Sequence, residues 1–341
     1  MHAINGYMYC NMPYPSFTEG RNSRIHFMVL GTYEDLHTPN LGGPHFTYLQ
    51  QSVDSMMMSA GTMIATDVTF TAPGNYEMHC RVADHVASGM RALYTVAPGE
   101  FVEKPSGKTR TYYVAADTVD WDYAPNGYVN CVAKDLSDTA REYIRASPET
   151  GNIGSKYTKA QYREYTDETF TRLKPVTQWQ GIMGPTITAA VGDRIRVVFK
   201  NNLRVPEGVD EETLSVNIAL QGSVRPTKDY AAGEAVAPGA TFTYEYYVTD
   251  ESGPASGDFN SVVYGYTSST DTVMWPSGGL MGVLHIVARG QLNETSGLPN
   301  GVDQVVPMYW MVMDENLSPY LDSNTAAAGI DVEKLNPKEV E

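Results

Sequence analysis

Apolar positions along the chain fall into short runs that are rich in β-branched or aromatic residues and are separated by Gly, Pro, Asn and Asp. Runs of this length with turn residues between them are typical of sandwiches or barrels rather than of βαβ units. The clearest predicted strands are TYYVAADTVDW (111–121), DRIRVVFKN (193–201), TFTYEYYVTD (241–250) and GVLHIVARG (282–290). One short stretch, SDTAREYIRAS (137–147), has helical character and suits the decoration of a loop. The pattern therefore predicts an all-β protein.

Two polar stretches divide the chain. The first, APGEFVEKPSGK (97–108), holds two Pro and two Gly, which is the composition of a linker. The second lies in GQLNETSGLPNGVD (290–303). They leave segments 1–97, 108–290 and 303–341, of which the last is too short for a domain of its own. A length of 341 residues suits about two domains that each bury a core.

Composition narrows the range of functions. The chain is 42% hydrophobic and 19% charged, as expected of a folded protein, and no apolar run approaches the roughly 18 residues of a membrane span. Its formal net charge of −16 argues against nucleic acid as a partner, because nucleic acid requires a basic face. Two sequons, Asn293-Glu-Thr and Asn316-Leu-Ser, are compatible with glycosylation of a secreted protein.

The stretch HCRVADHVASGM (79–90) contains the spacing C-x4-H-x4-M, which lets one strand and the following loop bring Cys80, His85 and Met90 around one ion. A blue-copper site consists of two imidazoles and a thiolate in a trigonal plane with a weak axial thioether. The fourth ligand must come from elsewhere, and His37 in GTYEDLHTPNLGG (31–43) is the natural candidate. Each residue alone is explained as well by packing in a core. The four together, in the right order, favour a metal site.

Longer stretches give the chain a resemblance to a known family. The sequence resembles ceruloplasmin and hephaestin, and in part the A domains of clotting factors five and eight, in MHAINGYMYCNMP, YEDLH, HCRVADHVASGMRALYTV, RTYYVAADTVDWDYAP, IGSKYTKAQYREYTDETF, GIMGPTITAAVGDRIRVVFKN and MVMDENLSPYLD. This resemblance covers nearly the whole chain. It implies two cupredoxin-like domains, each a Greek-key β-sandwich, in an extracellular copper protein. It also implies type 1 copper ligation by His37, Cys80, His85 and axial Met90.

The sequence departs from the family at a second kind of copper site. The relatives reduce dioxygen at a trinuclear copper cluster that is held by four His-x-His pairs. The eight corresponding positions here are Asn40, Gly42, His79, Arg81, Ala219, Gln221, Thr267 and Ser269. His79 alone cannot hold a copper ion, so we expect no trinuclear cluster and no oxidase activity from this chain alone. In six-domain relatives the cluster forms only between the first and last domains, so a longer parent chain is still compatible with an oxidase.

The remaining cysteines and several acidic residues are further candidates for cross-linking and metal binding. If Cys80 binds metal, Cys10 and Cys131 remain as a possible disulfide. Ferroxidase relatives also bind iron through acidic residues near the type 1 site. The acidic candidates here are Glu34, Asp35, Asp322 and Asp331, although solvated loop charges are the simpler interpretation.

The order of the motifs predicts a domain that is divided between the two ends of the chain. In the relatives MVMDENLSPYLD opens a copper-bearing domain and MHAINGYMYC follows later in the same domain, whereas here the opening strands lie at 308–322. Residues 1–97 and 303–341 would then form the copper-bearing domain around an intact second domain at 108–290. Either the chain is circularly permuted, or it is one period of a tandem array or longer parent chain. The array predicts head-to-tail self-association, because an unpaired sheet edge would otherwise be exposed.

Two functions follow as hypotheses. The first is an extracellular, ferroxidase-like unit that transfers single electrons through a type 1 copper site, with iron or a small molecule as the electron donor. The second is a structural repeat unit of a head-to-tail cupredoxin polymer, in which copper adds stability or colour.

Overall fold

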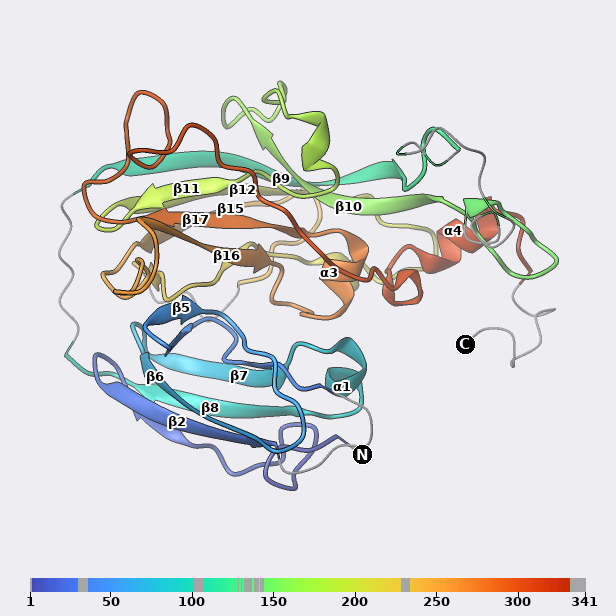
Figure 1. Ribbon diagram of the computed structural model, residues 1–341. Helices are drawn as coiled ribbons and strands as arrows, with labels where there is room; N and C mark the ends of the chain where they lie inside the picture. Colours follow the sequence, from blue (N-terminus) through green and yellow to red (C-terminus); the bar gives the residue numbers. More distant parts are fainter. Residues whose placement is uncertain are drawn as a thin grey trace.

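The computed structural model describes residues 2–29, 36–100, 107–127, 129, 131, 137, 141, 144–227 and 234–331. These residues form two β-sandwiches, which are blue to cyan and green to orange in Figure 1. The predicted all-β fold is therefore confirmed. The predicted helix at 137–147 lies largely outside the described residues. No helix in the described ranges is long and apolar enough to cross a membrane.

The first domain is a sandwich of two four-stranded sheets, ordered β1-β8-β7-β3 and β2-β6-β4-β5. The chain crosses repeatedly between them, as in a Greek-key sandwich. Its core contains Leu41, Phe46, Phe70 and Tyr94, and the Tyr94 hydroxyl donates to the Leu41 carbonyl at 2.7 Å. Its elements are β1 (Ser16–Thr18), β2 (Asn22–Val29), β3 (Pro39–Asn40), β4 (Phe46–Tyr48), β5 (Gln51–Val53), β6 (Thr62–Thr69), β7 (Gly74–Cys80), α1 (Ala83–Ala87) and β8 (Arg91–Ala97).

The second domain pairs a five-stranded sheet, ordered β10-β9-β12-β15-β14, with a four-stranded sheet, ordered β11-β17-β16-β13. Its larger core includes Trp275, Phe199 and Tyr266, all almost fully buried. Its elements are β9 (Thr109–Asp122), β10 (Lys156–Tyr165), η1 (Gln178–Gln180), β11 (Ile187–Ala190), β12 (Arg194–Asn202), η2 (Glu211–Leu214), β13 (Ala219–Leu220), β14 (Arg225–Pro226), β15 (Thr241–Tyr247), β16 (Ser261–Thr267), α3 (Met274–Gly278) and β17 (Met281–Val287).

The four strands predicted most clearly from sequence are all present as β9, β12, β15 and β17, with ends that differ by a few residues. β12 lies in the middle of its sheet and pairs on one side with β15 and on the other with β9. Ile195, Val197 and Phe199 project from one face of this strand into the core and are 0% exposed, which is why a run of β-branched and aromatic side chains marks it in the sequence.

The two domains share one pattern of strand pairing. β1 is parallel to β8 as β11 is parallel to β17, and β2 is antiparallel to β6 as β12 is antiparallel to β15. Cross-strand ion pairs occupy matching positions, Arg24 with Asp67 in the first domain and Arg196 with Glu245 in the second. The difference is the β9–β10 hairpin, which extends the second domain beyond β12 and has no counterpart beside β2 among the described residues.

The segment after the second domain runs across that domain in extended form (the orange-red trace of Figure 1) and ends in η3 (Glu315–Leu317) and α4 (Leu321–Ala327). Tyr320 is buried in the second domain's core, and Glu315 pairs with the fully buried Lys159. The described part of 303–341 therefore packs on its own second domain. Its completion of a copper-bearing domain with residues 1–97 stays a prediction.

Polar contacts join the two sandwiches. Arg225 of the second domain pairs at 2.8 Å with Glu19 of the first, whose side chain is buried. His45 is also buried at this interface, where its Nδ1 lies 3.0 Å from the Ser223 hydroxyl and its ring packs against Tyr264. Further hydrogen bonds run from Ser52 N to Asp258 (3.0 Å), from Thr71 Oγ1 to Ser223 O (3.0 Å) and from Gly222 N to Gly43 O (2.9 Å).

Burial of His45 makes the stability of the folded chain depend on pH. Burial lowers the pKa of His45 to about 4. The unfolded chain, with a histidine pKa near 6.5, binds more protons between these values, so the free energy of unfolding falls as pH drops from about 6.5 to 4. We expect His45 alone to account for about 3 kcal/mol of this loss. Denaturant unfolding of the wild type and His45→Asn across that range measures it. The slope should be shallower in the variant, and it should be unchanged in His26→Asn, which alters an exposed position on β2.

Candidate metal centre

Backbone pairing brings His37 and Cys80 together. His37 exchanges hydrogen bonds of 2.9 and 2.8 Å with Met58, and two residues later Pro39 of β3 pairs with Cys80 at the end of β7. Because both residues lie at the same end of neighbouring strands, their side chains reach one point between the sheets. The register of these strands thus brings together His37 and Cys80, which lie more than forty residues apart in the sequence.

The loop after β7 returns to the same point. Helix α1 carries His85, which is buried, and the Met90 N–H then donates to the His85 carbonyl at 2.8 Å. The Cys80 N–H donates to the Met90 carbonyl at 3.2 Å, which closes the loop. Gly89 adopts φ +102°, and a Cβ there would lie only 3.0 Å from Met8 and Tyr9. The turn therefore requires glycine at this position.

The resulting cluster has the donors of a soft metal site. The ligand atoms of His37, Cys80 and His85 all lie within 4.8 Å of one another, and Cys80 Sγ is 3.4 Å from His85 Nδ1. Within the described part of the chain, no other group of three or more His, Cys, Asp or Glu residues is gathered in this way. Cys80 and His85 are each only 2% exposed, whereas His37 is partly exposed. Two imidazoles, a thiol and the nearby Met90 match the donor set of a type 1 copper site.

Two residues that sequence reasoning missed lie beside this cluster. The Thr38 N–H points to Cys80 Sγ at 3.3 Å, and the Thr38 hydroxyl lies 3.7 Å from the same sulfur. The His2 ring stacks on that of His85, with centroids 4.3 Å apart. Thr38 directly follows the predicted ligand His37, so its position next to a ligand was a signal in the sequence. His2 stands 83 positions before His85, and no spacing rule connects them.

Comparison with curated proteins finds relatives that match almost the whole chain. No protein-family model matches the chain. Ferroxidase HEPHL1 of Homo sapiens is 34% identical over 337 residues, which are 95% of this chain and 28% of that protein. Hephaestin of Homo sapiens is 29% identical over 98% of the chain and 29% of its own length. Ceruloplasmin of Homo sapiens is 29% identical over 100% of the chain and 31% of its own length.

This chain is a homologue of the hephaestins and ceruloplasmins. It spans less than a third of the length of these relatives. Among solved structures, a copper nitrite reductase from Nitrosomonas europaea is 13% identical and covers 83% of this chain and 85% of its own, with a TM-score of 0.26. So low a score adds nothing to the fold, which rests on the strand pairing described above.

In this homologue of hephaestin, two of the positions that the resemblance aligns with His-x-His pairs, Arg81 and Gln221, meet at the interface of the two domains. Asn40 pairs with His79 in the first domain, and Ala219 pairs with Thr267 in the second. Across the interface, Arg81 Nη2 donates to Gln221 Oε1 at 2.6 Å, and within the first domain it donates to Asp54 at 2.7 Å. A guanidinium and an amide therefore meet at these two positions.

The backbone at Gly42 is unsuited to an imidazole. Gly42 adopts φ +69°, and a Cβ there would lie 2.4 Å from the Glu77 carbonyl oxygen. Burial, followed by the nearby Arg81 and Arg91 cations, lowers the pKa of His79 to about 3. His79 is thus a neutral, buried imidazole beside two arginines.

The remaining predicted residues do not join the cluster. Cys10 is a partly buried free thiol and Cys131 an exposed one, so a disulfide between them stays a prediction. Asn293 and Asn316 are both exposed, as glycosylation requires. Among the acidic candidates for iron, Asp322 and Asp331 are exposed, whereas Glu34 and Asp35 lie outside the described residues.

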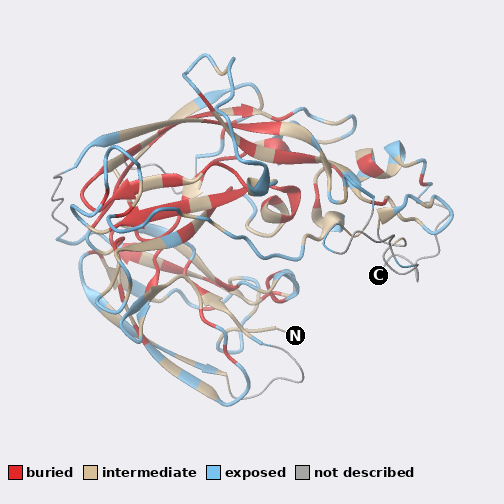
Figure 2. Cartoon of the chain, turned by 45° about the horizontal axis from the view of Figure 1, so that its top comes forward, coloured by how far each residue is buried: buried red, intermediate tan, exposed pale blue. Residues whose placement is uncertain are grey.

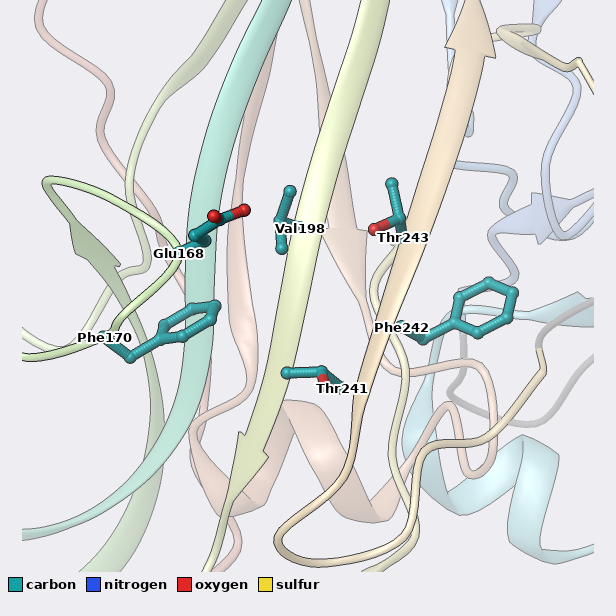
Figure 3. A pocket seen from close by; sticks show the side chains of 6 residues that line it. All are labelled: Glu168, Phe170, Val198, Thr241, Phe242 and Thr243. Carbon is teal, nitrogen blue, oxygen red and sulfur yellow. The ribbon is translucent and has the colours of Figure 1, made fainter.

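A separate hollow lies on the outer face of the second domain, over β12 and β15 (Figure 3). It is open to solvent and is lined by Glu168, Phe170, Val198, Thr241, Phe242 and Thr243. Its walls are threonine, valine and phenylalanine with one carboxylate, so it offers no donor set for copper.

The contacts of Arg81 predict a cost for its removal. Arg81→Leu leaves the Asp54 carboxylate and the Gln221 amide without their donor at the interface, so we expect the free energy of unfolding to fall by about 1–2 kcal/mol. Denaturant titration measures the change. Arg24→Leu removes a solvent-exposed ion pair within the first domain and should cost clearly less than Arg81→Leu. Equal losses in the two variants would contradict a special role for Arg81.

Proposed function

We propose that this chain is an extracellular, type 1 copper-binding unit for one-electron transfer, with His37, Cys80, His85 and Met90 as ligands. The observation that carries the proposal is the convergence of two imidazoles and a thiol within 4.8 Å in a largely buried setting. Copper, when bound, supplies a one-electron couple at this point. The relationship to ceruloplasmin and hephaestin supports copper over zinc as the metal.

The chain's own residues prepare the site. Burial of Cys80 and His85 excludes water from the thiolate and one imidazole. The Thr38 N–H donates toward Cys80 Sγ and disperses its negative charge. His2 stacks on His85 and, together with the closed loop of residues 80–90, limits the motion of that ring. A rigid site changes little in shape between oxidation states, which favours fast electron transfer.

We further propose that this unit has no oxygen-reducing cluster of its own. Only one of the eight corresponding positions is histidine, and Arg81 pairs with Gln221 where cluster ligands would be required. The electron acceptor is then another protein or another part of a longer parent chain. The name ferroxidase belongs to the HEPHL1 relative; for this chain, ferrous iron or a small organic reductant is the proposed donor. Exposed sequons at Asn293 and Asn316 support secretion.

A second candidate function is a structural repeat unit in a head-to-tail cupredoxin assembly, with copper adding stability or colour. It is favoured by the extended segment before η3, in which Trp310 and Val312 are 88% and 89% exposed. Large apolar side chains at such exposure are typical of a surface that is covered in an assembly.

Replacement of the thiol ligand tests the copper proposal. The purified chain loaded with Cu(II) should show the intense blue absorption of thiolate-to-copper charge transfer, and Cys80→Ser should abolish it. Cys10→Ser, which removes a free thiol outside the cluster, should leave it unchanged. A chain that binds Cu(II) without colour, or whose colour survives Cys80→Ser, would refute the type 1 assignment.

Thr38 gives a second, independent readout. Thr38→Val keeps the side-chain shape and the backbone N–H but removes the hydroxyl that lies 3.7 Å from Cys80 Sγ. With less positive charge near the sulfur, the oxidised site is stabilised, so the reduction potential should fall. Redox titration followed by absorption measures the shift. Thr47→Val, at an exposed position on β4, is the control, and a potential that is identical in all three proteins would show that the hydroxyl has no effect.

A further inference from the structure

One residue of the second domain reaches toward the candidate metal centre of the first. Gln221 directly follows β13 and is only 9% exposed. Its Oε1 accepts a hydrogen bond of 2.6 Å from Arg81 Nη2, and Arg81 directly follows the predicted ligand Cys80. Figure 2 shows buried segments (red) on both sides of this domain boundary. A contact made by the second domain therefore lies one residue from the thiol.

The side chain of Arg81 is held from both domains. Besides Gln221 Oε1, the same nitrogen has Asp54 Oδ2 as an acceptor within the first domain, at 2.7 Å. Gln221 is itself fixed, because the next residue, Gly222, donates its N–H to the Gly43 carbonyl at 2.9 Å. The guanidinium thus has one acceptor in each domain, and loss of either acceptor loosens its position.

The backbone of Arg81 orients the groups of Thr38 that face the thiol. The Arg81 N–H donates to the Thr38 carbonyl oxygen at 2.9 Å and to the Thr38 hydroxyl oxygen at 3.1 Å. Because this oxygen accepts from Arg81, the hydroxyl hydrogen is directed away from it, and Cys80 Sγ lies 3.7 Å from the oxygen. The Thr38 N–H donates to the same sulfur at 3.3 Å. A displacement of Arg81 would therefore alter two dipoles that face Cys80.

We propose that Gln221 is a positioning residue for the copper site, which fixes Arg81 and, through Arg81, the Thr38 groups that face Cys80 Sγ. This inference rests on the proposed copper function. Hydrogen bonds to the cysteine sulfur disperse the negative charge of the thiolate and raise the reduction potential of a type 1 site. The second domain, whose described residues gather no metal-binding cluster of their own, thereby sets the potential of copper in the first.

A different hydrogen bond across the same interface provides a matched control. The Thr71 hydroxyl donates to the Ser223 carbonyl at 3.0 Å, and both residues are buried. The same carbonyl also accepts from Thr249 at 3.2 Å, so this contact leads into the second domain rather than toward Cys80. Thr71→Val removes one hydrogen bond between the domains and leaves the contacts of Thr38 in place.

Redox titration of the copper-loaded chain, followed by its thiolate-to-copper absorption, tests the route to the sulfur. Gln221→Met keeps the length and the neutral charge of the side chain but removes the acceptor of Arg81. We expect the equilibrium constant for reduction of the site by a one-electron mediator to fall about threefold, as for a weakened hydrogen bond, and Thr71→Val to leave it unchanged. In a Thr38→Val background the effect of Gln221→Met should be smaller, because the hydroxyl that Arg81 orients is gone.

Three results of this titration would overturn the proposal. The first is an unchanged potential in Gln221→Met. The second is an equal shift in Gln221→Met and Thr71→Val, which would show that any weakening of the interface acts on the site. The third is an effect of Gln221→Met that has the same size with and without the Thr38 hydroxyl.

Amide hydrogen exchange of the metal-free chain, measured by NMR, gives a readout that needs no copper. Gln221→Met should speed exchange of the Thr38 and Arg81 amides about threefold. Gln221→Glu, which keeps an oxygen at the acceptor position, and Thr71→Val should retain the wild-type rates. Unchanged rates in Gln221→Met refute the positioning role, whereas a chain without type 1 colour refutes the copper proposal, so the two failures are distinguishable.

Discussion

The antiparallel pairing of β3 with β7 is the contact on which the metal centre depends. It fixes Cys80 opposite Pro39, two residues from His37, while the hydrogen bond from Cys80 N to Met90 O returns the following loop to the same place. The sandwich around this pair therefore gathers the donors of the proposed copper site. A shift of one residue would turn the Cys80 side chain to the opposite face of its sheet and disperse the cluster.

The end of β7 serves both the candidate metal centre and the domain interface. Cys80 points to the metal centre, and the next residue, Arg81, binds Asp54 and Gln221. Alternation along a strand makes this possible, because neighbouring side chains leave opposite faces. The Arg81 N–H also donates to the Thr38 carbonyl at 2.9 Å, so the residue that bridges the domains is tied to the one that contacts the sulfur. A displacement of one domain relative to the other would thus be passed from Arg81 through Thr38 to the Cys80 sulfur.

Much of this organisation follows from sequence patterns, and the part that does not depends on long-range contacts. Buried strands such as β12 are marked by their own side chains, and Cys80, His85 and Met90 lie close enough in sequence for their spacing to predict one loop. The stacking of His2 on His85 and the meeting of Arg81 with Gln221 follow from strand register and domain packing, which no local pattern encodes. The motif order predicts a copper-bearing domain divided between residues 1–97 and 303–341, and this stays a prediction. Likewise, burial of Tyr320 in the second domain depends on side-chain packing that the motif alone does not specify.

The methionines of the described residues fall into buried and exposed groups. Met56 and Met58 are buried in the first domain's core and behave as ordinary packing residues. Met28 and Met63 pair across β2 and β6 with both side chains about two-thirds exposed. Met308 is exposed on the extended segment before η3. Methionine is flexible and polarizable, so it tolerates water and also fills irregular apolar contacts. Exposed methionines are therefore weak evidence for capture of a soft metal, because the one donor cluster of His, Cys, Asp or Glu in the described residues is built from His37, Cys80 and His85.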